Sequence, residues 1–218
     1  MLITDFIIND IKPVSETKNI GEVQSIFSQT TYSHVPIAKD ETYMGCLAEA
    51  DAHCYDSDCV ITDYIHACQN FFIRYEANWL QVLEAFTQHN TNIMPVLKED
   101  NTYMGYYELG DVMNFFGNTP FMSLPGNTVI IEKRLLDYSL SEISQIVESN
   151  DGRVLGVFIS LINNETAQIS LKVGNSNFND ILAAFRRYSY TIVSSHQEDL
   201  FLKDLQDRSR YLEKYLNI

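Results

Sequence analysis

The stretch that decides the fold is ITDFI at residues 3–7, because it returns as ITDYI at residues 61–65. Three further blocks return in the same order: VQSIFSQ at 23–29 as VLEAFTQ at 82–88, VPIAK at 35–39 as MPVLK at 94–98, and YMG at 43–45 as YMG at 103–105. The offset between the copies drifts only from 58 to 60 residues. Four blocks kept in order and nearly in register indicate a duplicated module.

Each copy predicts the same succession of elements. Residues 21–30 and 79–90 carry apolar side chains at helical spacing, which are Val23, Ile26 and Phe27 in one copy and Leu80, Leu83 and Phe86 in the other. A short apolar strand, a polar turn and a second strand follow, and a glycine inside the second strand indicates a close backbone approach. Another helix begins near Asp51 or Asp111. The predicted unit is helix–strand–turn–strand–helix.

The second half of the chain has a different pattern. Residues 114–126 form its densest Pro/Gly stretch and predict a domain boundary. Beyond this boundary the pattern predicts strands at 128–134, 153–162, 167–173 and 190–194, with helices at 140–149 and 178–188. The order βαββαβ is the ferredoxin-like arrangement. Residues 197–218 predict a polar C-terminal helix. The expected fold class is therefore α/β (α+β).

The duplicated pattern, with its x-P-h strand and its h-G-h-x-x-x-D ending, resembles the cystathionine-β-synthase (CBS) domain. Two such copies in tandem resemble a CBS pair, or Bateman module. The second half is similar to an ACT-like domain, as in CBS–ACT accessory proteins of the acetoin-utilisation type. The resemblance implies a CBS pair over residues 1–116 (repeats at about 1–58 and 59–116), a linker over 117–127 and an ACT-like domain with its C-terminal helix over 128–218.

In CBS pairs, the two clefts between the repeats often hold adenine nucleotides or S-adenosylmethionine. The resemblance therefore implies that Asp51 and Asp111 receive the ribose hydroxyls of a ligand. It also implies that the strands around Pro36 and Pro95 border the clefts. His34 opens the first of these strands, where its ring would stack on a base. The alternative for His34 is a half-buried histidine at the end of a strand, without a ligand.

Two departures from the family pattern bear on the ligand. The hydroxyl positions that commonly meet phosphate in CBS domains are occupied by Ala48, which lacks a donor, and Glu108, which would repel phosphate. Residues 1–111 hold 5 Lys/Arg and 17 Asp/Glu, a net charge of −12. ATP is therefore disfavoured, and an adenosine derivative such as AMP or S-adenosylmethionine is preferred. The alternative is that both aspartates cap the following helices and bind nothing.

ACT domains usually bind an amino acid at a D-x-P-G-x-L turn after their first strand. The corresponding residues 137–141 read DYSLS, so the Pro-Gly step is missing. Ser139 or Ser141 acting as an ordinary helix N-cap is the alternative to a ligand site.

Composition excludes several classes of function. The net charge of −14 argues against a general nucleic-acid binder, which needs basic patches. The longest apolar run, at residues 154–162, is too short to span a bilayer. The N-terminal residues lack the basic and apolar regions of a signal peptide. We therefore expect a cytoplasmic protein that does not bind nucleic acid or membranes.

No pattern of catalytic or metal-binding residues stands out. The P-loop, dinucleotide-binding and nucleophile-elbow motifs are absent, and the five histidines form no H-x-x-x-H pair. Cys54, Cys59 and Cys68 lie near two histidines, but they lack the tight paired spacing of structural zinc sites. We expect no enzyme and no bound metal, with a zinc module around these cysteines as a minor alternative.

The sequence thus predicts a non-catalytic regulatory protein in which a small adenosine-type ligand binds between the repeats and changes their packing. The alternative is a ligand-free interaction or scaffold protein with degenerate clefts. The resemblance also implies a homodimer, because CBS pairs and ACT sheets tend to associate side by side in the proteins of those families. A further protein partner is expected in either case.

Overall fold

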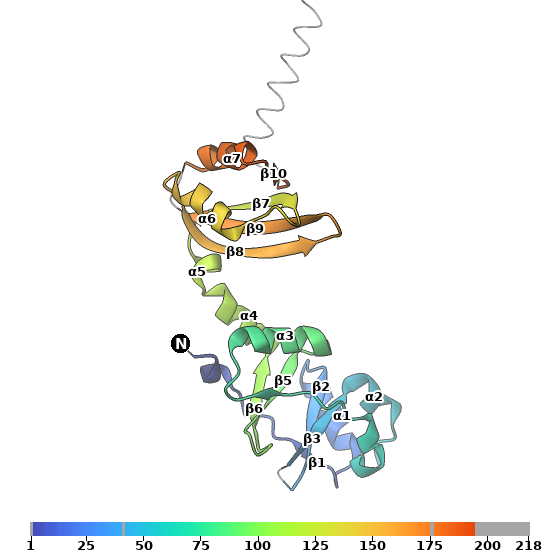
Figure 1. The fold of residues 1–218 in the computed structure, drawn as a ribbon. Helices are drawn as coiled ribbons and strands as arrows, with labels where there is room; N and C mark the ends of the chain where they lie inside the picture. Colours follow the sequence, from blue (N-terminus) through green and yellow to red (C-terminus); the bar gives the residue numbers. More distant parts are fainter. Residues whose placement is uncertain (1, 41, 175–176, 195–218) are drawn as a thin grey trace, which may run out of the picture. The chain divides into compact units, whose positions relative to one another are not determined.

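The computed structural model describes residues 2–40, 42–174 and 177–194, and these divide into two compact units, residues 1–118 and 119–218 (Figure 1). The predicted boundary segment 117–127 contains both the division after Asn118 and a short helix, α5 (Pro120–Ser123). The predicted C-terminal helix at 197–218 lies outside the described residues. No helix within the described ranges is long and apolar enough to cross a membrane.

The first unit consists of two equivalent halves. Repeat 1 contains η1 (Ile3–Phe6), β1 (Val14–Ser15), α1 (Ile20–Gln29), β2 (His34–Lys39), β3 (Thr42–Ala48) and α2 (Glu49–Cys54). Repeat 2 contains η2 (Ile61–Ala67), β4 (Ile73–Arg74), α3 (Trp79–His89), β5 (Ile93–Leu97), β6 (Tyr103–Glu108) and α4 (Leu109–Gly117). The predicted order helix–strand–turn–strand–helix is confirmed in both copies.

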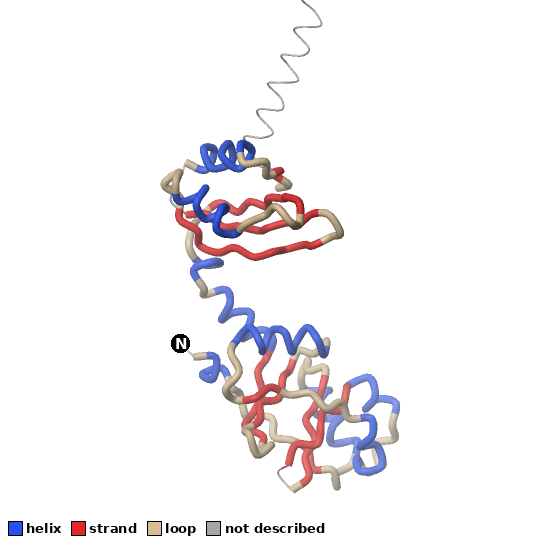
Figure 2. The backbone as a smooth tube through the Cα atoms, viewed as in Figure 1, coloured by secondary structure: helices blue, strands red, loops and turns tan. Residues whose placement is uncertain are grey.

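Each repeat forms one three-stranded sheet, in the order β1-β2-β3 or β4-β5-β6 (Figure 2). The outer strand of two residues pairs in parallel with the central strand, and the hairpin pairs antiparallel. Both hairpins shift register at the same place, between Ile37 and Ala38 and between Val96 and Leu97. The two sheets therefore reproduce each other down to a local irregularity.

The helices bury one face each against these sheets. In α1 the buried residues are Ile20, Val23 and Phe27, and in α3 they are Val82, Ala85 and Phe86. Leu80 was expected on the apolar face of α3, and this expectation is wrong, because Leu80 is 59% exposed. It is the second residue of the helix, two positions after the Asn78 cap, and the buried face begins two residues later, at Val82.

The two repeats exchange their leading segments. Ile8, in the leading segment of repeat 1, pairs with Tyr106 of repeat 2 through two backbone hydrogen bonds of 2.9 and 2.8 Å. Gln69, in the leading segment of repeat 2, pairs with Cys46 of repeat 1 through bonds of the same two lengths. The apolar residues follow the backbone: Ile3 lies in the core of repeat 2, and Ile61 lies in the core of repeat 1.

Each exchanged segment passes close to a glycine of the other repeat: the segment with Gln69 passes Gly45, and the segment with Ile8 passes Gly105. Gly45 and Gly105 have φ angles of +140° and +144°, which side-chain-bearing residues rarely adopt. A Cβ on Gly45 would lie 3.1 Å from the Gln69 carbonyl oxygen, whereas a Cβ on Gly105 would overlap the Ile8 carbonyl oxygen. The predicted close approach at these glycines is confirmed, and it is the exchange of segments that causes it.

The second unit is a four-stranded antiparallel sheet. Its elements are β7 (Asn127–Arg134), α6 (Leu140–Glu148), β8 (Arg153–Ile162), β9 (Thr166–Gly174), α7 (Phe178–Arg187) and β10 (Thr191–Ile192). The strand order is β10-β7-β9-β8, and α6 and α7 bury their apolar residues with one face of the sheet in a single core (Figure 1). The predicted ferredoxin-like arrangement is confirmed.

Replacing Gly105 by Ala should lower the free energy of unfolding of the first unit by about 3 kcal/mol, because the new methyl group meets backbone and the φ angle is unfavourable. Gly45→Ala should lower it by about 1–2 kcal/mol, since strain dominates there. Denaturant unfolding followed by the emission of Trp79, the chain's one tryptophan, measures this unit.

The matched control is Gly110→Ala in α4, where a Cβ would meet nothing within 4 Å. This change should be neutral or stabilise by about 0.5–1 kcal/mol, as Ala favours helix. Equal effects of the Gly105 and Gly110 substitutions would contradict the exchange of segments as the constraint on position 105.

Candidate functional site

The two repeats meet at the beginnings of their central strands. Ser33 and Asn92 occupy equivalent positions and contact each other: the Ser33 backbone N–H donates to Asn92 Oδ1 at 2.8 Å, and the Asn92 side chain donates to the Thr31 carbonyl at 2.7 Å. The first N–H groups of α2 and α4 donate to the carbonyls of Ser33 and Asn92 at 2.9 and 3.0 Å. The first turns of both helices, with Asp51 and Asp111, are thereby tied to this contact.

Neither aspartate caps its helix. The N-cap residues are Ala48 and Glu108, and neither side chain bonds the helix backbone. The alternative in which Asp51 and Asp111 are caps is therefore wrong: each is the third residue of its helix, in the first turn, where the positive helix start favours a carboxylate. No described residue forms a hydrogen bond or ion pair with either carboxylate.

Beside Asp51, aromatic rings fill the space between the repeats. The His34 ring meets the Phe71 ring edge-on at 5.1 Å between centroids, and Phe71 stacks on His89 at 5.0 Å. His34 is only 6% exposed. Its Nδ1 lies 2.9 Å from the Ser33 hydroxyl, but no residue in the described part of the chain hydrogen-bonds its buried Nε2. We call these three rings and Asp51 the Asp51 cleft.

Burial shifts the pKa of two groups beside Asp51, His34 and Cys68. Burial lowers the pKa of His34, while the nearby Gln69 side chain and the Asp51 carboxylate act in the opposite direction and His89 adds to the lowering. Burial, with help from Asp51, raises the pKa of the Cys68 thiol to about 11. At neutral pH a neutral His34 imidazole and a neutral Cys68 thiol therefore lie near the Asp51 carboxylate.

The equivalent region of repeat 2, before Asp111, is closed by a hydrogen-bonded network. The Tyr106 hydroxyl donates to Asp10 at 2.5 Å and lies 2.9 Å from the Tyr32 hydroxyl, which donates to Glu108 at 2.5 Å. Burial raises the pKa of Tyr106 above its usual range, and burial together with Glu108 raises that of Tyr32 to about 12. Glu108, at the lost hydroxyl position, is thus used to hold the repeats together.

The remaining predicted positions, Pro36 and Pro95, lie inside the central strands. Pro36 and Pro95 are buried in β2 and β5, opposite Cys46 and Tyr106, and the two-residue strands β1 and β4 pair only with the residues that follow each proline. His34 and the equivalent Ile93, each two residues before its proline, are the first residues of β2 and β5. Phe71, His89, Tyr32 and Asp10 were missed, although aligning residues 8–11 with 69–72 would have matched Asp10 with Phe71 and indicated both.

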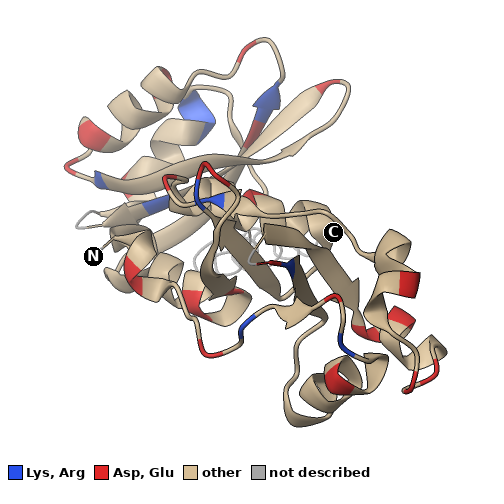
Figure 3. Cartoon of the chain, turned by 90° about the horizontal axis from the view of Figure 1, so that it is seen from below, with Lys and Arg blue, Asp and Glu red and all other residues tan. Residues whose placement is uncertain are grey.

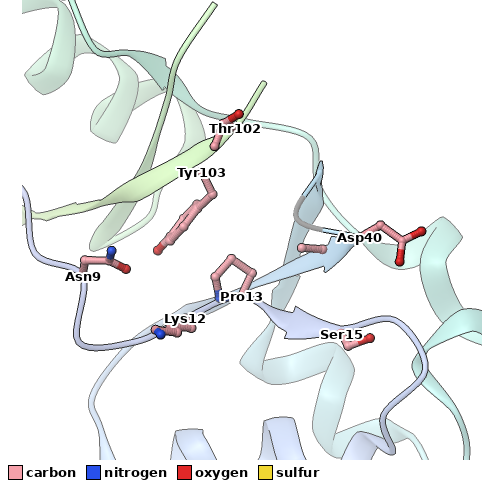
Figure 4. Close-up of a pocket in the computed structure, with 8 residues that line it drawn as sticks. Asn9, Lys12, Pro13, Ser15, Asp40, Thr102 and Tyr103 are labelled. Carbon is pink, nitrogen blue, oxygen red and sulfur yellow. The ribbon is translucent and has the colours of Figure 1, made fainter. Parts of the chain in front are cut away.

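The open pockets lie elsewhere. A pocket of about 550 Å³ opens between the N-terminal segment and the two hairpins, with Lys12, Pro13, Asp40, Thr102 and Tyr103 around it (Figure 4). Neither Asp51 nor Asp111 lines any of four well-formed pockets of the described residues. The space beside Asp51 and before Asp111 is occupied instead by the rings and the hydrogen-bonded network described above.

The cysteines separate into different environments. Cys46 is buried, Cys54 is exposed and donates to the Ala50 carbonyl, and Cys59 accepts from the Tyr64 hydroxyl. Within the described ranges no group of three or more His, Cys, Asp or Glu side chains could hold a metal ion.

In the second unit, the turn at 137–141 provides a helix cap. Ser139 is the N-cap of α6, and its hydroxyl accepts from the Glu142 N–H at 3.3 Å. The Glu142 carboxylate instead binds Lys133 and the Tyr190 hydroxyl, both at 2.8 Å, and these bonds hold the pKa of Glu142 below its ordinary value. The N-cap alternative is confirmed for Ser139.

Charge distinguishes the two units. The first carries 5 basic and 17 acidic residues up to Asp111, whereas the rest of the chain carries 10 and 12 (Figure 3). The contacts of the Asp51 cleft described above include no Lys or Arg. An anionic ligand would meet an unfavourable field there.

Comparison with known proteins places these features in context. No protein-family profile and no curated protein matches the chain. Among solved structures it is similar to a CBS domain pair/ACT domain protein from Thermotoga maritima, with 19% identity and a TM-score of 0.48 over 53% of this chain and 96% of that one. It is also similar to the CBS domains of a transcriptional regulator from Streptococcus pneumoniae (16% identity, TM-score 0.47, 52% and 98% covered) and to CBSX2 in complex with AMP (14%, 0.45, 53% and 95%).

Removing the Tyr106 hydroxyl should weaken the contact between the repeats. Tyr106→Phe loses a bond to a carboxylate and one to Tyr32, and we expect the free energy of unfolding to fall by about 1.5–3 kcal/mol. The neighbouring Tyr107→Phe is the control, because the Tyr107 hydroxyl is buried with no partner in the described residues, and its loss should be neutral or stabilising. Denaturant unfolding of both variants measures the difference, and equal losses would disprove the network.

Proposed function

We propose that this chain is a non-catalytic regulatory protein whose Asp51 cleft takes a neutral or weakly charged adenosine-type ligand. The observation that carries the proposal is the buried His34 Nε2, which lacks a partner beside the free Asp51 carboxylate. A buried acceptor without a hydrogen bond costs about 1–3 kcal/mol, and a ligand that donates to it recovers that energy. The exocyclic amine of adenine is such a donor, and ribose hydroxyls suit a carboxylate.

Charge selects among adenosine derivatives. The net charge of −12 over residues 1–111 and the acidic Asp51 disfavour a triphosphate. AMP carries less negative charge, and S-adenosylmethionine brings cationic groups that the acidic unit favours. Either ligand must displace part of the His34–Phe71–His89 stack to reach Asp51, so binding changes how the repeats pack.

We propose that this change in the packing of the two repeats transmits ligand binding to the rest of the protein or to a partner. Each repeat contributes a segment and a core residue to the other, so a shift at Phe71, next to the exchanged Gln69, moves both sheets. The coupling equals the difference in ligand affinity between the two packings. The ferredoxin-like unit, proposed as ACT-like, or a partner protein would detect it in the cytoplasm. The Asp111 side, closed by its network, binds no ligand in this proposal.

A second candidate has its own observation. Both clefts are filled by the chain's own side chains, as expected for an interaction or scaffold protein that has lost its ligand. In that case the paired repeats serve only as a rigid platform.

A thermal-shift panel of adenosine, AMP, ATP and S-adenosylmethionine at millimolar concentration distinguishes the regulatory protein from the scaffold. We expect AMP or S-adenosylmethionine to stabilise the first unit, and a ligand at 100 times its Kd adds about 2.7 kcal/mol, or several degrees. ATP should act less. Asp51→Asn should abolish the shift, and the matched variant Asp111→Asn should retain it. A flat panel would refute the ligand proposal and favour the scaffold.

We infer that the expected homodimer forms through the β8 edge of the second unit. The sheet ends on one side with the two-residue β10 and on the other with the ten-residue β8, whose residues 154–162 carry no charge. Phe158 and Leu161 on β8 are 49% and 50% exposed. Edges of this length are normally protected by charge or proline. Antiparallel pairing of two β8 strands places apolar residues against apolar residues and closes with twofold symmetry.

Sedimentation velocity tests this inference. The wild type should be a dimer, and Phe158→Lys/Leu161→Lys should be a monomer at the same concentration with an unchanged circular dichroism spectrum. Val193→Lys, at the opposite edge and 45% exposed, should remain a dimer. A monomeric wild type, or a dimer that survives the double substitution, would exclude the β8 edge.

A further inference from the structure

A second pocket of the first unit lies at the start of α3 in repeat 2. The equivalent place in repeat 1, at the start of α1, is occupied by the chain itself and indicates what kind of molecule the pocket binds. The pocket measures about 490 Å³ and is lined by Leu2, Ile3, Tyr75, Glu76, Trp79 and Phe115, among others. An adjoining pocket of about 370 Å³ shares Glu76 and Ala77 with it. We call the two pockets together the Trp79 groove. The volume is in the range of ligand-binding pockets.

Repeat 1 is closed at the equivalent place. There residues 57–60, a turn that ends in the extended residue Val60, lie along the start of α1: Ile20 N–H donates to the Cys59 carbonyl at 2.9 Å, and Gly21 N–H donates to the Ser57 carbonyl at 3.0 Å. Next along the chain, Ile61 N–H donates to the Lys18 carbonyl at 2.9 Å. Main-chain carbonyls thus satisfy the free donors at the beginning of the helix.

Repeat 2 treats the same donors differently. Trp79 and Leu80 correspond to Ile20 and Gly21, and the Asn78 side chain accepts from Leu80 N–H at 3.0 Å and from Gln81 N–H at 3.1 Å. Asn19, the equivalent of Asn78, makes no such bond. No described residue accepts from the Trp79 N–H. The groove therefore keeps one main-chain donor of the kind that takes a peptide carbonyl in repeat 1.

The walls of the groove are aromatic. Trp79 stacks on Phe116 at 5.5 Å between ring centroids and lies 5.9 Å from Phe115. Leu2 and Leu80, at 70% and 59% exposure, add apolar surface at its rim. The groove also belongs to the unit with a net charge of −12 over residues 1–111, and Glu76 lines both of its pockets.

From these features we propose that the Trp79 groove binds an extended peptide segment of a partner protein, with a backbone carbonyl on Trp79 N–H, a bulky apolar side chain against the Tyr75, Trp79 and Phe115 rings, and basic residues on either side. The extended backbone follows from Val60, which pairs antiparallel with Asn19 in repeat 1, and the basic flanks follow from the acidic unit. This site is separate from the Asp51 cleft and does not depend on a ligand there.

The test uses a fluorescein-labelled peptide, KSKLVITK. It copies residues 57–62 of repeat 1 with Lys and Leu in place of the aspartate and the cysteine and with a Lys at each end. We expect saturable binding to the full chain in fluorescence polarisation, accompanied by a change in Trp79 emission. The acidic peptide ESELVITE should bind at least about tenfold more weakly at low salt.

Ala77 lines both pockets. The substitution Ala77→Arg places a long side chain in the groove and should weaken binding of the peptide about tenfold or more. Leu2→Asp is a second variant at an exposed rim position, so that the result does not depend on whether the first variant folds. Lys18→Arg, at the equivalent position of repeat 1, is the control and should bind like the wild type. No saturable binding up to millimolar peptide, or equal binding to all variants, would overturn the proposal.

Discussion

The first unit depends on the exchange of leading segments between its repeats. The backbone of Ile8 pairs with Tyr106, and that of Gln69 pairs with Cys46, so each sheet receives hydrogen bonds from chain that belongs to the other repeat. The segments can pass this closely only because Gly45 and Gly105 have no side chains. Separating the repeats therefore breaks backbone pairing and two cores at once, which makes the pair one cooperative unit.

On this shared backbone the repeats have diverged in their side chains. At one contact Tyr106, Tyr32, Asp10 and Glu108 satisfy each other, and at the other His34 keeps an unpaired nitrogen. The starts of the two helices differ in the same way, because repeat 1 uses main-chain carbonyls where repeat 2 uses Asn78. A duplicated fold thus provides its own internal control: wherever one copy is satisfied and the other is not, the difference indicates a place for a ligand or partner.

Burial decides the charge of the two groups beside Asp51, although the Asp51 carboxylate opposes the effect of burial on the pKa of His34. Burial keeps His34 and Cys68 neutral, and Asp51 remains as the charged group. A site of this kind favours hydrogen-bonding ligands of low negative charge over a triphosphate. The acidic first unit repels anions and attracts basic partners, which gives the Asp51 cleft and the Trp79 groove different specificities on the same module.

By itself, the sequence determined the duplication, the succession of elements in each copy, the ferredoxin-like order of the second unit and the need for glycine at positions 45 and 105. These features follow from local periodicity and from blocks repeated along the chain, which are visible without a third dimension. Only the tertiary structure showed that Phe71 and His89 fill the space beside His34, that Glu108 meets Tyr32, and that Leu80 faces outward. Those contacts join residues far apart in the chain, and Leu80 lies in the first turn of its helix. In neither case does the spacing of residues along the sequence predict the neighbours. The aspartates were found from the repeat, but whether a cleft beside them is open is decided by which neighbouring side chains pack into it.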